Sequence, residues 1–554
     1  MSNLFVRKAT GLVRSWSVFD AFVYAFFSIN LITLGLYSFS QMYYFGGGMV
    51  PALIVSAVFI FFEVVVYAGL IAVMPRSGGD YVWQSRILGG GIGFVLAVTG
   101  WWFILWLWVP LYGDMFRHIV LVPILGVLGA KDLAIWFASN QSGFLGLNGA
   151  FTASLLTLII VSIFIALGMK TYARIQKYSF YGGMLGLFLV IVLLLTGSPD
   201  KFKDGLEKNA VSMFGAQSGV YDATVALGTN AGASLPFTGG SVSLIFLTLP
   251  YLVFFNLWPN WGATLYGEVR GATDFKRNIS GMGWALGATT LLGIVLLYAI
   301  GKTVGWDFYV QAGGAWWNYA WGFSTDTPAL PVWPYPALFA AFLTSSKILQ
   351  FLVVVLMSLW WFGWSGTVFL SSTRVIFAAA FDRLLPEKVA EVDERTGTPI
   401  YALLMMVVPS VVVAFLFNYN IAGFQSLTLC STLVIAVTYL GTTIAAIILP
   451  YRKPELYKAS PIAQYNVLGI PLITVAGVIF GGFLVFLLYQ WILDPNALYG
   501  IGYSINENGY KNGTSLIYMG VNYLLAAAIY FGFKSARKSQ GIDIDKVHAE
   551  IPVE

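Results

Sequence analysis

The sequence predicts an all-α polytopic membrane protein with about twelve transmembrane helices. Three observations predict this class: 58% of the 554 residues are hydrophobic, only 10% are charged, and the hydrophobic residues gather in long runs. Soluble globular proteins carry about 25% charged residues, and a bilayer-spanning helix needs about 20 mostly apolar residues. The composition excludes a soluble enzyme, a disordered scaffold and a small disulfide-rich secreted module.

Twelve apolar stretches of suitable length follow one another along the chain, without the strict alternation of β-barrel strands. Basic residues precede the first stretch and no small-residue cleavage site follows it, so we interpret it as a retained helix and not a signal peptide. The stretches begin near Ser17, Met49, Gly91, Asn148, Phe180, Ser241, Ile279, Ser346, Ile400, Gly423, Asn466 and Ser515.

Lys and Arg residues predict the orientation. About 22 of the 30 fall in the two terminal segments and in every second loop, and cytoplasmic loops carry an excess of Lys and Arg. We therefore expect a multi-pass protein of the cell (cytoplasmic) membrane with both termini in the cytoplasm. Long loops at about 126–147, 197–239 and 302–335 would lie outside, as would the sequons at Asn140 and Asn512, whose glycosylation the sequence leaves open.

The sequence indicates no cofactor, no metal site and no catalytic residues. One Cys and two His residues are too few soft ligands for zinc, haem or an iron–sulfur cluster. The basic residues are scattered, so no nucleic-acid-binding surface is visible. We do not expect an enzyme, and the predicted partners are the lipid bilayer, a small-molecule substrate and a coupling ion, H⁺ or Na⁺.

The first and sixth stretches carry polar and helix-breaking residues at mid-membrane depth. Pro259 removes a backbone donor and clashes with the preceding turn, and unpaired backbone groups are tolerated there only where they face protein or a cavity. Paired broken helices form the substrate site in transporters with inverted repeats. The alternative is two kinked helices with satisfied Asn side chains. The substrate-binding candidates are Ser28, Asn30, Leu31, Thr33 and Gly35 in the first stretch and Asn256, Leu257, Trp258 and Asn260 in the sixth.

Three motifs resemble those of the amino acid–polyamine–organocation (APC) transporter superfamily. Met74-Pro-Arg-Ser-Gly-Gly-Asp-Tyr81 matches the inner loop Pro-x-x-Gly-Gly-x-Tyr of that family. The segment from Ser372 to Pro386, continuing to Gly397-Thr-Pro399, resembles the loop after span 8, and Gly267-Glu-Val-Arg270 resembles the end of span 6. The chain is thus similar to amino acid permeases from about Ser15 to Gln490.

The resemblance implies two inverted five-helix repeats with broken helices 1 and 6, and two peripheral helices. Substrate would sit between the broken helices and spans 3 and 8. Leu34 and Trp258 stand where relatives have small residues, which would shrink or reshape the pocket. The implied division is a cytoplasmic N-terminus at 1–14, the first repeat (spans 1–5) at 15–196, an outer loop at 197–239, the second repeat (spans 6–10) at 240–450, spans 11 and 12 at 451–533, and a polar cytoplasmic tail, expected to fray, at 534–554.

The same placement adds Ile104 and Trp108 of span 3 and Trp361 of span 8 to the substrate site. These side chains suit an apolar or aromatic substrate group, and few acidic residues accompany them, so we expect a neutral amino acid or a similar small organic solute. Glu63 is an ion-coupling candidate, because a charge in mid-membrane is costly and usually functional. Ser365 and Thr367 are further candidates, because their hydroxyl groups suit a sodium site.

These features together predict a secondary active transporter (permease), a symporter or antiporter, that works by alternating access. Proton coupling, sodium coupling, uniport and exchange all remain open. The alternative is a non-transporting membrane subunit or sensor that retains the transporter fold, which the bulky Leu34 and Trp258 would favour. A solvent-connected cavity at mid-membrane would favour the transporter.

Overall fold

The structure is a computed structural model that describes residues 16–143, 146–427, 430–492 and 513–551. Within these residues, twelve helical segments are long and apolar enough to cross a bilayer. The one sheet in the described chain is an antiparallel hairpin of β1 (Asn466–Val467) and β2 (Ile470–Pro471). The predicted all-α polytopic fold class is therefore confirmed.

The twelve spans include several composite helices. Spans 1 to 6 are α1 (Val18–Ile29) and α2 (Leu36–Gln41) joined by a π-helical turn (Leu31–Gly35); α3 (Met49–Val73); α5 (Gly90–Val98), α6 (Trp108–Phe116) and α7 (Val122–Val127) joined by π and 3₁₀ turns; α9 (Gly149–Ala166); α10 (Met169–Thr196); and α13 (Val242–Asn256) followed by a 3₁₀ helix (Pro259–Glu268). Spans 7 to 12 are α14 (Phe275–Ile300); α17 (Lys347–Trp364) with α18 (Thr367–Phe381); α19 (Ile400–Asn418); α21 (Ser431–Arg452); α23 (Leu472–Ile492); and α24 (Gly513–Ser539).

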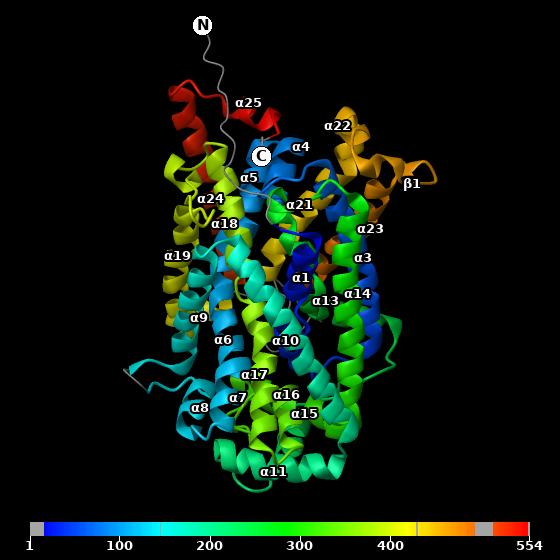
Figure 1. Cartoon of the computed structure of the whole chain (residues 1–554), viewed down its shortest axis with the longest axis vertical. Coiled ribbons are helices and arrows are strands. Elements are labelled where there is room, and N and C mark those ends of the chain that lie inside the picture. Colours follow the sequence, from blue (N-terminus) through cyan, green and yellow to red (C-terminus); the bar gives the residue numbers. More distant parts are fainter. Residues whose placement is uncertain (1–15, 144–145, 428–429, 493–512, 552–554) are drawn as a thin grey trace.

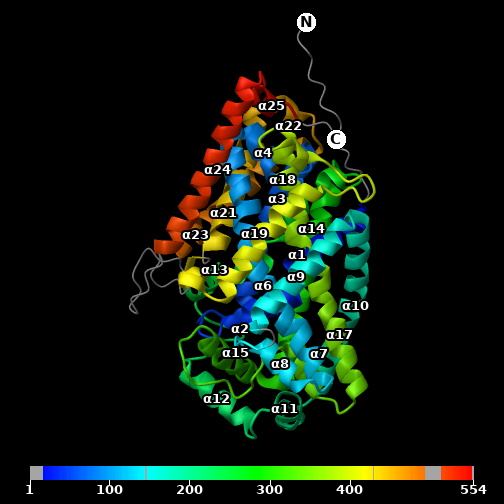
Figure 2. The ribbon, with the colours of Figure 1, turned by 90° about the vertical axis from the view of Figure 1, so that its left-hand side faces the viewer.

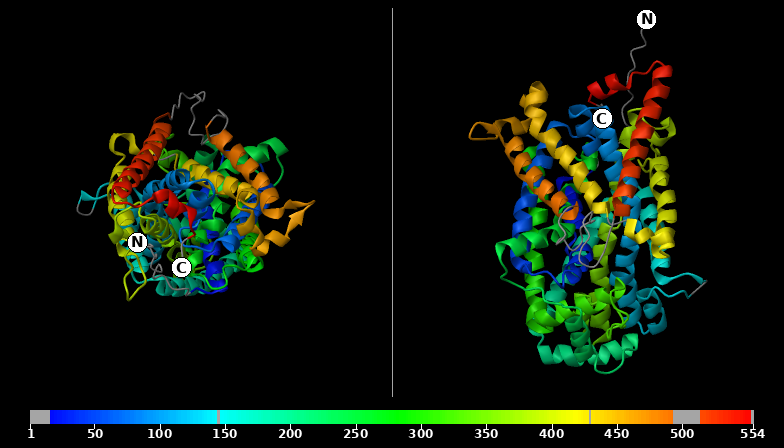
Figure 3. Two further views of the ribbon diagram at one scale, coloured as in Figure 1. Left: turned by 90° about the horizontal axis from the view of Figure 1, so that it is seen from above. Right: turned by 180° about the vertical axis from the view of Figure 1, so that it is seen from behind.

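Shorter helices cover the two ends of the bundle, and α24 and the hairpin lie at its periphery (Figures 1, 2 and 3). We name the ends after the helices that cap them, the α25 face and the α11 face. The short helices are α4 (Asp80–Ile87), α22 (Pro454–Lys458) and α25 (Ile544–Ala549) at the α25 face, α8 (Lys131–Ala138), α11 (Pro199–Phe214), α12 (Val220–Asn230), α15 (Trp306–Ala320) and α16 (Pro336–Phe342) toward the α11 face, and α20 (Phe424–Leu427) beside α24.

Side-chain caps begin several spans where the sequence changes from polar to apolar. Ser17 and Asp20 form a reciprocal capping box at the start of α1, and Asn148 Oδ1 accepts a hydrogen bond from Phe151 N at the start of α9. Ser241 and Ser346 cap α13 and α17 in the same way. Such caps satisfy backbone N–H groups that have no partner inside the helix.

Three predicted span starts differ from the structure. Span 5 begins at Met169 and not near Phe180, because its first turns, which carry Lys170 and Arg174, continue the helix beyond the apolar run. Spans 10 and 11 begin later than predicted, at Ser431 and Leu472. Before span 11, Leu468 and Gly469 both have positive φ and form the turn of the β1–β2 hairpin.

The long loops and the tail hold more helix than the sequence suggested. In α11, Pro199 occupies the first turn and the apolar residues Phe202 and Leu206 are buried. The tail does not fray over its described part, since α24 continues to Ser539 and α25 packs against the bundle, leaving His548 only 5% exposed. Asn140 lies on an exposed loop, whereas Asn512 and residues 1–14 lie outside the described residues.

Candidate substrate site

The first helix interruption centres on Asn30, between α1 and the π-helical turn. Asn30 has a φ of 46°, in the left-handed region, which Asn tolerates better than most residues. Its Oδ1 accepts a hydrogen bond from Thr33 N at 2.8 Å, and its Nδ2 donates to Trp360 O in α17 at 3.0 Å. Asn30 therefore caps the turn and ties span 1 to span 8. Beside it, Ser28 Oγ donates to Tyr24 O at 2.8 Å.

The second interruption follows Asn256, where α13 ends and the 3₁₀ helix begins at Pro259. Trp258 has a φ of −130° and a ψ of 11°, outside helical geometry. Asn256 Oδ1 accepts a hydrogen bond from Ser56 Oγ of α3 at 2.9 Å. The predicted breaks in helices 1 and 6 are therefore both present.

Several polar atoms at the two breaks are buried without a hydrogen bond to any described residue. They are Thr33 Oγ1, Asn256 Nδ2, and both Nδ2 and Oδ1 of Asn260. An unmade hydrogen bond of this kind costs roughly 1–3 kcal/mol. The breaks therefore offer donors and acceptors that a small polar molecule or water would satisfy.

The two broken helices cross in close contact. A Cβ atom at Gly35 would lie 2.9 Å from Cδ2 of Phe255, the residue before Asn256, and one at Gly262 would lie 3.1 Å from Cδ1 of Tyr24. Glycine permits this approach of backbone to side chain. Leu31, which follows Asn30, and Leu257 are both fully buried beside these crossings.

Aromatic rings from spans 3, 6 and 8 surround the breaks. Trp108 and Trp258 pack edge to face with ring centroids 5.1 Å apart, and Trp361 Nε1 donates to Tyr112 O of α6 at 3.1 Å. The structure thus brings Trp108 to the sixth-helix break and Trp361 next to Trp360, the partner of Asn30. Ile104 is buried in a 3₁₀ turn (Ile104–Leu107) that packs against α19 and α21.

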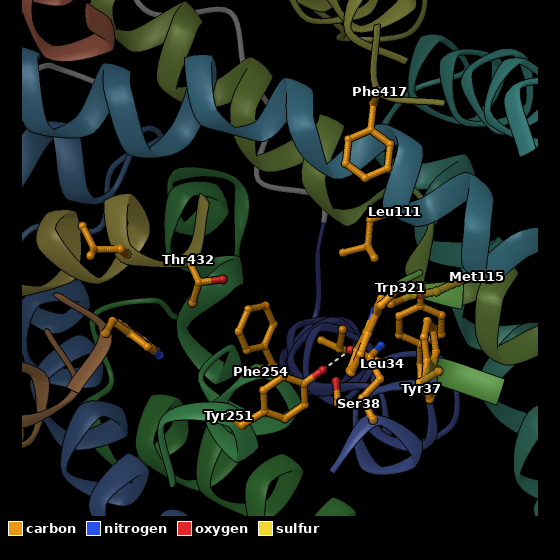
Figure 4. Close-up of a pocket in the computed structure, with 14 residues that line it drawn as sticks. Leu34, Tyr37, Ser38, Leu111, Met115, Tyr251, Phe254, Trp321, Phe417 and Thr432 are labelled. Atoms are coloured by element: carbon orange, nitrogen blue, oxygen red, sulfur yellow. Dashed lines mark hydrogen bonds between the residues drawn. The ribbon is translucent and has the colours of Figure 1, made fainter. Parts of the chain in front are cut away.

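A cavity of about 260 Å³ lies on the α11 side of the first break. Leu34 of the π-helical turn borders it, so the cavity reaches the interruption. Figure 4 shows Tyr251 and Phe254 on one side of it and Trp321 and Met115 on the other. The residues that line it are Leu34, Tyr37, Ser38, Gln41, Leu111, Met115, Tyr251, Phe254, Trp317, Trp321, Phe417, Thr432, Leu433 and Trp491.

None of the twelve predicted substrate-binding residues belongs to this cavity lining. All twelve are buried, and the cavity itself continues along one face of α2 through Tyr37, Ser38 and Gln41. Tyr37, Ser38 and Gln41 follow Leu34 by three, four and seven residues, so helical periodicity places them on one face. Polar residues on one face of an apolar span could have indicated a cavity there. Trp317 and Trp321 come from α15 and the turn after it, in a segment that the sequence suggested was a loop, and carried no such signal.

Comparison with protein-family models gives a match that covers nearly the whole chain. The model described as amino acid permease matches residues 19–529, which include both breaks and every residue of the cavity lining. The chain belongs to this family. A search of the curated proteins found no match. The family and the twelve apolar helices together make the chain a multi-pass membrane transporter of small molecules such as amino acids.

Two buried ion pairs of the permease lie toward the α25 face (Figure 1). Arg374 Nε of α18 lies 2.7 Å from Glu268 Oε1 of the 3₁₀ helix, and both side chains are buried. Arg86 of α4 pairs with Asp382 at 2.5 Å. Asp80, at the same face, accepts hydrogen bonds from the hydroxyl groups of Tyr67 and Thr442.

The ion-coupling candidates of the permease lie in two separate places. Ser365 and Thr367 flank the junction of α17 and α18, where Thr367 Oγ1 is 3.3 Å from the Tyr112 hydroxyl and Ser365 Oγ bonds to Phe362 O at 3.3 Å. Glu63 is fully buried in α3, and neither of its carboxylate oxygens has a hydrogen-bond partner among the described residues.

Proposed function

We propose that this permease is a secondary active transporter of a neutral amino acid or a similar small organic solute, working by alternating access. The observation that carries the proposal is the pair of interrupted helices, in contact with each other, with a cavity beside them. The orphaned Asn256 and Asn260 amides and Thr33 hydroxyl would bind the polar groups of the solute. The twelve residues predicted from the sequence would form the floor of the site.

The lining chemistry supports a neutral solute. Aromatic and aliphatic side chains dominate the cavity, and its polar groups are the neutral Ser38, Gln41, Thr432 and tyrosine hydroxyls. A cavity without a carboxylate in its lining would leave a polycation unpaired, and burial of an unpaired charge is costly. Aromatic and aliphatic walls instead favour an apolar side chain on the solute.

We further propose that the α25 face is cytoplasmic and that the membrane is the cell membrane. The basic motif loops with Arg86 and Arg374 lie at this face, as the excess of cytoplasmic Lys and Arg requires. The closed α25 face and the cavity toward the α11 face then correspond to a state that receives solute from outside. In this reading spans 1–5 and 6–10, at 15–196 and 240–450, are the inverted repeats.

Uptake by reconstituted proteoliposomes tests the function. We expect the wild type to accumulate at least one radiolabelled neutral amino acid with saturable kinetics, and Asn256→Ala to reduce uptake about tenfold or more, equivalent to about 1.4 kcal/mol of lost binding. Asn209→Ala is the matched control, because Asn209 is a buried asparagine in α11, away from the breaks. Normal uptake by Asn256→Ala would show that the site is elsewhere.

The same preparation separates a transporter from a non-transporting subunit or sensor. A sensor would bind an amino acid and rise in melting temperature, as linkage requires, yet move no label into the vesicles. A subunit with a lost pocket would do neither. The orphaned polar atoms at the breaks argue against a subunit with a lost pocket, and uptake of label separates the transporter from the sensor.

A further inference from the structure

Two buried carboxyl groups near the second break have no cationic partner among the residues that the structure describes. Glu63 of α3 and Asp80, the first residue of α4, are both fully buried. Over the described part of the chain, neither forms an ion pair. Buried charges are normally paired with an opposite charge or neutralised by a change in protonation. The negative charge of these two carboxylates must therefore be neutralised in another way.

Hydroxyl groups donate hydrogen bonds to Asp80, and one of them belongs to Tyr67 on the same helix as Glu63. Tyr67, one helical turn after Glu63, donates to Asp80 Oδ1 at 2.7 Å, and Thr442 Oγ1 of α21 donates to the same oxygen at 2.5 Å. Asp80 Oδ2 has no partner among the described residues. The ring of Tyr439 lies 5.7 Å from that of Tyr67, and its hydroxyl is within electrostatic range of both carboxyl groups.

Two buried polar side chains of the sixth span, which lack hydrogen bonds within the described structure, lie near Tyr439 and the start of α4. Asn260, which is fully buried with both side-chain polar atoms unbonded within the described structure, approaches the Tyr439 hydroxyl. Thr264, four residues later, is also buried with an unbonded Oγ1. Thr264 O accepts a hydrogen bond from Gly78 N at 2.8 Å, which holds this helix against the start of α4.

The carboxyl groups are connected to the second break through one face of α3. Ser56, Glu63 and Tyr67 are spaced by seven and four residues, so they share that face. Ser56 donates to Asn256 at the break, and Tyr67 donates to Asp80 near the α25 face. These three polar residues are therefore aligned along α3 from the break toward the α25 face.

The surroundings favour a neutral, protonated carboxyl pair. Burial raises the pKa of the Asp80 carboxyl to about 6, against the opposing hydrogen bonds from Thr442 and Tyr67. Tyr67 and Tyr439 face the pair. Other ionisable groups on the packed elements pair elsewhere: Arg86, Tyr81 and the buried His548 with Asp382, Glu268 with Arg374, and Tyr251 with Gln41. The remaining ionisable groups on these elements are Tyr266, Lys276, Arg277, Tyr298, Tyr451, Arg452, Tyr489, Asp545 and Lys546.

We propose that Glu63 and Asp80 form a proton-binding pair that couples proton movement to solute transport in this permease, an inference that rests on the proposed transport function. Each carboxylate binds one proton through a new O–H bond when the pair is loaded. Both O–H bonds break and both protons return to water at the α25 face when that face opens. The hydroxyls of Tyr67 and Tyr439 lie along the route between the two carboxyl groups.

Infrared titration of the purified permease tests proton binding without any need for transport. We expect a carbonyl-stretch band of protonated carboxyl groups that weakens as the pH rises through about 6, the pKa of the Asp80 carboxyl. The loss should be reduced in both Glu63→Gln and Asp80→Asn, and unchanged in Asp222→Asn, which removes an exposed carboxylate. An unaltered band in both variants, or a titration displaced when Na⁺ replaces K⁺, would overturn the proposal.

A transport measurement then separates this inference from the proposed function. With an acidic outside, we expect wild-type and Asp222→Asn proteoliposomes to concentrate a labelled neutral amino acid, and Glu63→Gln and Asp80→Asn to lose at least about tenfold of that accumulation. If the wild type moves no solute, the proposed function fails and the infrared result still stands. If the wild type accumulates solute and both variants still respond to the pH gradient, the proton pair is wrong.

Discussion

At the residue scale, Asn30 combines three properties that the first break requires. It adopts the left-handed conformation, caps Thr33 N and donates to Trp360 O. Alanine would lose both side-chain hydrogen bonds and would be strained at this φ. Glycine would also lose both hydrogen bonds but would not be strained. The break is therefore specified by one side chain as well as by backbone flexibility.

We expect Asn30→Ala to lower the free energy of unfolding by about 2–4 kcal/mol, because two buried backbone groups lose their partner and the residue is strained. The loss in Asn30→Gly should be roughly 1 kcal/mol smaller than in Asn30→Ala, because glycine adopts the positive φ without strain. Chemical unfolding in detergent would measure both values. Equal losses in the two variants would mean that the positive φ carries no cost for alanine.

Asp80 gives a pH dependence with a definite sign. Folding raises its pKa to about 6, above an unfolded value of about 3.9. The folded state therefore binds more protons between those values, and the contribution of this group to stability falls as the pH rises through them. Asp80→Asn should gain melting temperature relative to wild type as the pH rises from about 4 to about 6. A difference that stays constant over this range would contradict the raised pKa.

At the element scale, the buried pair of Arg374 and Glu268 joins α18 to the 3₁₀ helix of span 6. Removing one partner leaves a buried charge alone, which costs about 3–5 kcal/mol, whereas removing both is far less harmful. We expect Arg374→Met to destabilise the protein strongly and Arg374→Met with Glu268→Gln to recover most of that loss. A double-mutant cycle in thermal unfolding would measure the coupling. Additive losses would show that the two side chains act independently.

The breaks were predictable because polar residues, a proline and a glycine stand out inside apolar spans. Their partners were not predictable in the same way. Trp317 and Trp321 reach the cavity because α15 folds back over the bundle, and Phe417 and Trp491 reach it from two distant spans. These are tertiary contacts, and no local pattern around these residues indicates which helix they face.

For Glu63, too, the sequence indicated a property of the residue but not its tertiary neighbour. Its burial was predictable because a charged residue stands inside an apolar span. Its proximity to Asp80 was not predictable, because the motif loop that contains Asp80 is polar in sequence and looks solvent-exposed. The loop is instead held inside the protein by Gly78 N bonding to Thr264 O, and by Tyr67 and Thr442.

At the scale of the whole molecule, the α25 face and the α11 face differ in how they are closed. Buried ion pairs join α4, α18 and the 3₁₀ helix of span 6 at the α25 face. The cavity is lined toward the α11 face by the aromatic side chains Trp317 and Trp321. Alternating access requires these two closures to exchange, with the broken helices between them.

Thiol labelling of Ser38→Cys in a Cys430→Ser background tests the central claim most directly, because Ser38 lines the cavity and Cys430 is the one cysteine of the chain. Ser212→Cys, exposed on α11, is the control that should label regardless of solute. We predict that a membrane-impermeant reagent modifies the thiol introduced by Ser38→Cys from the α11 face and that a transported amino acid protects it. Modification that no amino acid changes, or its absence from both faces, would contradict a solute site beside the two broken helices.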